Sequence, residues 1–319
     1  MLKNIFIFLL LFSVGYGQSD RSQILFNSSG GPSCELLDLL AFVKIEHDGS
    51  WQSIVTETQK HLRRPNQELW EVAPRDDLPL DQAYRLFEQM GMIDSIIACK
   101  QHYRYAAILG STVEIVRDRF LFLKEQWERG VRFSELIIMG AERPLAPFER
   151  STQKTETEMM LKLFQELDLP LEWRSMPITV ISPPIPEGKA RPQTMHQFID
   201  WMNIDPEPGS LLVISSQPFV GRQDAVARNH TPFPVETIGM GVSYDHFCKE
   251  PIAISVLIET LARWIYEVVV LKDSCFLKES QRMLKICGTI TSASTKSMLP
   301  QRDFTPAIAP QKIRAAVNK

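Results

Sequence analysis

Tyr105-Ala-Ala-Ile-Leu-Gly-Ser-Thr112 is the stretch that decides the fold, because a short apolar run ends abruptly there in Gly-Ser-Thr. Two later stretches repeat this layout, Glu135-Leu-Ile-Ile-Met-Gly140 and Leu211-Leu-Val-Ile-Ser-Ser-Gln217. Short apolar runs separated by helix-length segments are typical of βαβ units in a parallel sheet. Ligands of such sheets bind beyond the carboxyl ends of the strands, so we expect a site where these three runs end.

The segments around these runs carry helix or strand signals. Apolar residues recur at helical spacing from Val113 to Arg129, and Gly130 follows as a natural stop. Further strands are expected at 177–181 and 235–238, and further helices at 155–168, 192–203, 219–228 and 252–271. The sequence therefore predicts an α/β protein with a Rossmann-like parallel sheet that is flanked by helices, preceded by a helical N-terminal lead-in.

Composition divides the 319 residues into five parts. Lys3, an apolar run and Gly15-Tyr-Gly17 have the layout of a cleaved signal peptide over residues 1–17, with an uncleaved anchor as the alternative. The rest is expected to form a flexible leader (18–33), a helical lead-in (34–103), the Rossmann-like domain (104–288) and a disordered tail (289–319). We therefore expect an exported protein of the periplasm or cell envelope. Contact with the membrane stays open.

The net charge and the cysteines indicate which ligands and bonds are not expected. The formal net charge is −3, which gives no reason to expect binding to nucleic acid. The five cysteines form no CxxC pair, so a zinc ribbon is not expected and we predict no metal site. An odd number leaves at least one thiol free or intermolecular, and the pairing of the others stays open. No cofactor can be named from the sequence.

The first turn after an apolar run is the leading candidate for an anion site. Gly110 and Ser111 are small, so backbone N–H groups can approach a phosphate at the start of the following helix. Arg119, with Arg117 as the alternative, lies one to two turns into that helix and can reach a phosphate or carboxylate. The competing interpretation is an ordinary strand-to-helix turn followed by a solvated helix face, since no phosphate-loop motif is present.

The remaining candidate ligand or catalytic residues lie after the second and third apolar runs and at the starts of later helices. Gly140 ends the second run, and Glu156 opens the next helix, where it serves either as a cap or as a general base. Thr194 and Gln197 begin another helix. Two further candidates follow the third run, namely Ser215, which lacks a GxSxG elbow, and Arg222, which is placed to meet an anion.

The order of these pieces resembles the SanA/YdcF/ElyC-like family. The shared features are a Gly-ended strand with an Arg in the next helix, a second Gly-ended strand, an acid before a helix, and a strand ending in a hydroxyl residue. In addition, Thr155-Glu-Thr157 resembles that family's Ser-Glu-Ala, and Gln193-Thr-Met-His-Gln197 resembles its Asn-Thr-x-x-Asn. The resemblance covers residues 104–240 and implies a Rossmann-like fold and a role in the bacterial envelope.

The chain departs from that family at several motif positions. The triple-glycine turn is Gly-Ser-Thr here, both Asn of the Asn-Thr-x-x-Asn motif are Gln, and the family's His position falls on Phe219. If that His takes part in chemistry, this chain binds a ligand without turning it over.

These observations lead to one main function hypothesis and two alternatives. The main hypothesis is an exported protein that binds a phosphate- or nucleotide-bearing small molecule in envelope biogenesis, with Glu156 as polar ligand or base; Mg²⁺ held by Glu156 and phosphate stays open. The first alternative is a non-catalytic envelope scaffold or binding protein with a degenerate site. The second is a cytosolic nucleotide enzyme without a leader. The sequence does not decide whether the protein is an enzyme.

Overall fold

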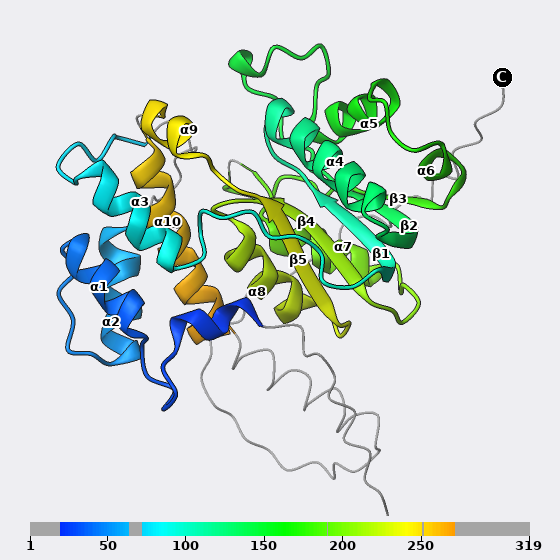
Figure 1. Cartoon of the computed structure of the whole chain (residues 1–319). Coiled ribbons are helices and arrows are strands. Elements are labelled where there is room, and N and C mark those ends of the chain that lie inside the picture. The colour runs from blue at the N-terminus through cyan, green and yellow to red at the C-terminus, as the bar shows by residue number, and fades with distance from the viewer. Residues whose placement is uncertain (1–19, 64–71, 190, 251, 272–319) are drawn as a thin grey trace, which may run out of the picture.

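The computed structural model describes residues 20–63, 72–189, 191–250 and 252–271 (Figure 1). The predicted signal peptide, the first two residues of the predicted leader and the predicted tail lie outside these ranges. Within them, no helix combines the length and the apolar character needed to cross a membrane.

Five parallel strands form one sheet in the order β3-β2-β1-β4-β5. They are β1 (His102–Leu109), β2 (Arg132–Met139), β3 (Ile178–Ile181), β4 (Leu211–Ser216) and β5 (Val235–Met240). Tyr105 pairs with Glu135 of β2 on one side and with Leu211 of β4 on the other, so the three apolar runs are the central strands. The predicted α/β Rossmann-like fold is therefore confirmed.

Helices cover both faces of the sheet, as an all-parallel sheet requires (Figure 1). Helices α4 (Val113–Glu128) and α5 (Glu156–Glu166) cover one face, where Ala106 and Ile108 of β1 join their core. Helices α7 (Thr194–Asn203) and α8 (Val220–His230) cover the other face. Because side chains alternate along a strand, Tyr105 and Ala107 point to this second core. The short helices η3 (Pro147–Glu149) and α6 (Leu171–Ser175) lie in the connections around α5.

A separate helical layer packs beside the sheet (Figure 1). It consists of η1 (Arg21–Leu25), α1 (Cys34–Phe42), α2 (Trp51–His61), α3 (Leu80–Gln89), α9 (Tyr244–Lys249), α10 (Ala253–Tyr266) and the π-helical turn η4 (Glu267–Leu271). One core joins residues from both ends of this list, including Leu36 of α1, Phe87 of α3 and Leu261 of α10.

This layer differs from the predicted division of the chain in two ways. Helix α10 shares its core with α1–α3, so a boundary at 103/104 does not separate two hydrophobic cores. The segment 18–33 was expected to be a flexible leader, yet from residue 21 it forms η1 and buries Leu25 completely. Periodicity reveals which face of a helix is apolar, but not which other helix covers it.

Helices α8 and α10 meet at a close contact that joins the helical layer to the sheet. Gly221 lies in the first turn of α8, and a Cβ atom there would come within 2.5 Å of the Trp264 ring. Trp264 is itself 2 % exposed, so its ring has no free space to move into.

We predict that Gly221→Ala lowers the free energy of unfolding by roughly 1–3 kcal/mol, because it overpacks this contact. Helix propensity alone predicts the opposite sign, a gain of about 1 kcal/mol for Ala over Gly. Urea denaturation followed by circular dichroism distinguishes the two. A variant as stable as the wild type, or more so, would contradict the tight α8–α10 contact.

Candidate functional site

The carboxyl end of the sheet has a topological switch point between β1 and β4, the place where ligands of open α/β sheets bind. From β1 the chain continues into α4 on one face, and from β4 into α8 on the other (Figure 1). The N-cap residues of these two helices, Thr112 and Phe219, make no side-chain capping hydrogen bond. The first N–H groups of both helices therefore lack a side-chain acceptor. The helix dipoles make the region between these two helix starts, called the crevice below, attractive to anions.

Arg119 of α4 contacts the carboxyl ends of β1 and β4 and is 1 % exposed. Its Nη1 donates to the carbonyl oxygens of Leu109 at 2.7 Å and Gly110 at 2.9 Å, and its Nη2 donates to Ser216 Oγ at 2.9 Å. Its Nε is buried and has no hydrogen-bond partner. One guanidinium group thus connects the ends of β1 and β4.

The charge of Arg119 is not neutralised by direct contact. Among the ion pairs of the described residues, none involves Arg119, although the negative charge of Glu156 acts on it from a distance. Burial lowers the pKa of Arg119 to about 10, which still leaves it positive at neutral pH. Burying a cation without a paired anion is costly, so a ligand anion in this crevice would be stabilised by it.

Arg143 forms the second charged centre, and it does have acidic partners. It is buried in the loop after β2 and pairs with Glu149 at 2.8 Å and with Glu156 at 3.3 Å. Its Nη2 also donates to the Ser111 carbonyl oxygen at 3.2 Å. Burial by itself would lower the pKa of Arg143, but the bond to Glu149 and the charges of both acids raise it. Arg143 therefore ties together the turn after β1, the loop after β2 and the start of α5.

Glu156, predicted as cap or base, opens α5 within this network and is 6 % exposed. Burial raises its pKa, while Arg143 and, more weakly, Arg191 and Arg119 oppose the shift. The helix cap itself is Thr155, whose hydroxyl accepts from Glu158 N at 3.2 Å. A Cβ atom on Gly110 would lie 2.6 Å from the Glu156 carboxylate. Gly110 therefore makes room for Glu156, which sequence reasoning could not distinguish from making room for a ligand.

The residues after β2 are occupied by contacts within the protein. A Cβ atom on Gly140 would approach the Thr157 Cα atom to 2.8 Å, so this glycine permits α5 to pack closely. Gln197 Nε2 donates to the carbonyl oxygens of Met139 and Gly140 at 2.9 and 3.0 Å. Thr194 is half-buried as the first residue of α7. Unlike the Gln197 amide, the Thr194 side chain makes no hydrogen bond with the described residues.

Ser215 and Ser216 follow each other in β4 and therefore point to opposite faces. Ser215, the predicted ligand residue, is fully buried and bonds to Gln223 of α8. Ser216 points to the α4 side and bonds to Arg119. Ser215 therefore lies on the α8 side and Ser216 on the α4 side, a difference that the sequence does not show, and ligand binding by Ser215 stays a prediction.

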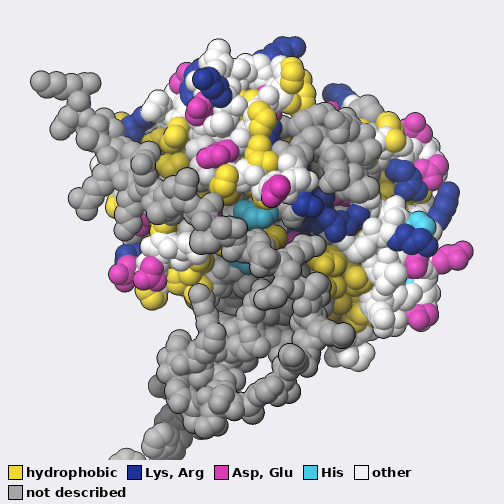
Figure 2. All heavy atoms as spheres, turned by 180° about the vertical axis from the view of Figure 1, so that it is seen from behind, with side chains coloured by type: hydrophobic (Ala, Val, Ile, Leu, Met, Phe, Trp, Pro, Cys, Tyr) yellow, Lys and Arg dark blue, Asp and Glu magenta, His cyan; other side chains and the backbone are white. Residues whose placement is uncertain are grey.

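Arg222 lies in the first turn of α8, where burial and the positive charge of Arg263 lower its pKa to about 10. Glu267 and Glu259, which act from the α10 side, oppose that shift. Seen from behind, basic side chains gather near the middle of the molecule beside acidic and histidine side chains (Figure 2). Arg222 is thus part of the charge network of the α8–α10 seam. Its Nε is also buried without a hydrogen-bond partner, so ligand binding by Arg222 stays a prediction.

Two residues that were not selected as ligands contact residues of the candidate site, Arg143 and Ser216. Ser216 ends β4 and Arg143 lies in the loop after β2, positions that the sequence suggests, but some of their partners are distant along the chain. Within the described ranges, no cluster of three or more His, Cys, Asp and Glu side chains could hold a metal ion. A hollow of about 470 Å³ lies elsewhere, in the helical layer, and is lined by Lys44, Glu57, Lys60, His61 and Arg75 among others.

Comparison of the chain with protein-family models, with curated proteins and with solved structures finds no match. The fold assignment therefore rests on the strand order, and the site rests on the geometry described above.

We predict that Arg143→Met lowers the free energy of unfolding by about 3 kcal/mol or more, because it removes the paired charge from two buried carboxylates. The matched control is Lys162→Met, which removes an exposed pair with Glu166 and should change stability by less than about 1 kcal/mol. Chemical denaturation of both variants measures the difference. If both variants changed the free energy of unfolding equally, Arg143 would not be the centre of the network.

Proposed function

We propose that this protein binds a phosphate-bearing small molecule in the crevice between β1 and β4. The observation that carries the proposal is Arg119, a buried cation whose Nε has no partner and which no carboxylate of the described residues contacts directly. The uncapped starts of α4 and α8 add backbone N–H donors at the same place. A phosphate would accept from the turn at Ser111 and Thr112, and Arg119 would stabilise its charge from below.

Binding without turnover is the form of this function that the contacts favour. The polar atoms of Gln197 and Ser215 are engaged by the protein, and Phe219 stands at the position of the related family's His. Glu156 is held by Arg143, so its role as a general base would require a ligand that displaces that contact. This supports the first alternative, a non-catalytic binding protein with a degenerate site.

Membership of the SanA/YdcF/ElyC-like family, export and a role at the bacterial envelope are proposed with this function. They are supported by the leader-like residues 1–17 and by the motif order across residues 104–240. An envelope partner protein and a cleaved N-terminus at Gln18 belong to the same proposal, and N-terminal sequencing of the mature protein tests the latter. A first residue at Met1 would favour the cytosolic alternative.

We predict that Arg119→Met weakens binding of AMP and of inorganic phosphate at least tenfold, because it removes the buried positive charge. Arg117→Met is the matched control, since Arg117 is an exposed cation on the same helix. Arg119→Lys keeps the charge and should retain part of the affinity even if the Met variant is less stable. Isothermal titration calorimetry measures all three, and equal binding by wild type and Arg119→Met would refute the proposal.

A further inference from the structure

Two helix starts border the crevice, and the proposed phosphate uses only one of them. That phosphate accepts from the turn at Ser111 and Thr112, at the start of α4. The start of α8 lies on the other side of the crevice, and its N-cap residue Phe219 offers no side-chain acceptor. Helix α8 has 11 residues, so its first N–H groups and its dipole can stabilise a second negative charge.

Arg222, in the first turn of α8, carries a buried donor group that lacks an acceptor. The side chain is half-buried, but its Nε is buried without a hydrogen-bond partner, the same condition as Nε of Arg119. Glu267 and Glu259 attract Arg222 through their charges, yet among the ion pairs of the described residues Glu259 pairs with Arg263, and none involves Arg222. A buried donor without an acceptor is costly, so an anion that accepts from it would be stabilised.

Several contacts place Arg222 and Arg119 at the same part of the carboxyl edge. Arg119 is 1 % exposed and donates to Ser216, which ends the strand that leads into α8. Arg191, in the loop before α7, acts through its charge on Arg222 and also on Glu156 at the start of α5. Because coulombic interactions weaken with distance, a charge that acts on both residues lies near both. The crevice is therefore bordered by arginines on its α4 side and on its α8 side.

We propose that the ligand carries a diphosphate group, with one phosphate at the start of α4 near Arg119 and the other at the start of α8, where Arg222 binds it. This inference rests on the proposed phosphate site and names the ligand class for it. Strands β1 and β4 are neighbours, roughly 5 Å apart, so the two helix starts flank one gap. A diphosphate reaches both sides of such a gap, whereas a single phosphate contacts only one.

The test compares inorganic phosphate with pyrophosphate in calorimetric titrations of the full chain. We expect wild type to bind pyrophosphate at least tenfold more tightly, Arg222→Met to remove most of that preference, and Arg119→Met to weaken both anions. Arg222→Lys keeps the charge and should keep part of the preference.

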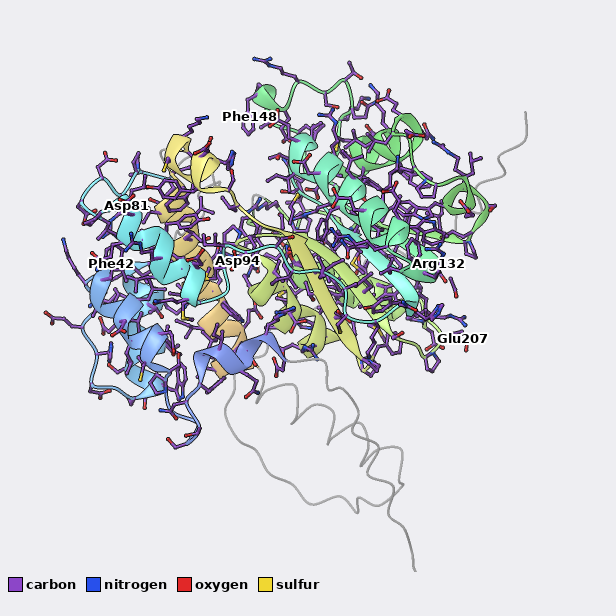
Figure 3. All side chains as sticks on the ribbon, in the orientation of Figure 1. Phe42, Asp81, Asp94, Arg132, Phe148 and Glu207 are labelled. Atoms are coloured by element: carbon purple, nitrogen blue, oxygen red, sulfur yellow. The ribbon has the colours of Figure 1, made fainter. Side chains whose placement is uncertain are left out.

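The matched control is Arg132→Met, which removes one positive charge far from the crevice. Arg132 begins β2 at the amino edge of the sheet, and Figure 3 shows it at the opposite end of the strands from the loop that carries Phe148. The preference for pyrophosphate should be unchanged in this variant. If circular dichroism shows that Arg222→Met does not fold, Phe219→Asp decides in its place. Asp is a favoured N-cap residue, and its carboxylate would occupy the position of the second phosphate and remove the preference.

The outcomes separate this inference from the phosphate site. If wild type binds both anions equally tightly, or if folded Arg222→Met keeps the preference, the diphosphate inference is wrong and the phosphate site stands. If folded wild type binds neither anion, both proposals fail.

A nucleotide or a prenyl lipid can carry the diphosphate group, and the same titrations distinguish these two sources. ADP is compared with AMP, and geranyl diphosphate with geranyl phosphate. A diphosphate that binds at least tenfold more tightly than its own monophosphate supports the inference and identifies the source. No difference within either pair would contradict it.

Discussion

An all-parallel sheet must be covered by helices on both faces, and this constraint determines where charge accumulates in the molecule. Every crossover helix begins near the carboxyl edge, so helix N-termini and strand-end side chains converge there. In this chain the edge also contains buried Arg119, Arg143, Glu149 and Glu156. Both acids contact Arg143, whereas none of the ion pairs among the described residues involves Arg119. The proposed anion site follows from that imbalance.

Two sets of close packing contacts hold these charged residues in place. The glycines at the strand ends allow Glu156 and Thr157 to approach the sheet, which brings the start of α5 against the turn after β1. The helical layer is attached from the other side through Gly221 and Trp264. Arg222, predicted from the sequence as a ligand residue, lies in the charge network of this attachment. Its position at the start of α8 was compatible with either role.

The fold could be predicted from the sequence because buried parallel strands are short apolar runs at regular spacing, and all three central runs fall inside β1, β2 and β4. The carboxyl edge of the sheet could be predicted as the place of the candidate site for the same reason. Which of Ser215 and Ser216 bonds to Arg119 could not be predicted, because it depends on which face of the sheet meets α4. The place of α10 beside α1–α3 could not either, since it depends on contacts between segments about 200 residues apart. A carboxylate such as Glu149 looks like an ordinary loop residue until its partner Arg143 is known.

The most direct test of the phosphate site is a crystal structure with tungstate, a phosphate analogue that can be located by its anomalous signal. The account predicts a tungstate ion in the crevice between β1 and β4, accepting from backbone N–H groups at Ser111 and Thr112 above Arg119. An ion bound instead at the basic hollow of the helical layer beside Lys44 and Lys60, or no bound ion at all, would contradict it.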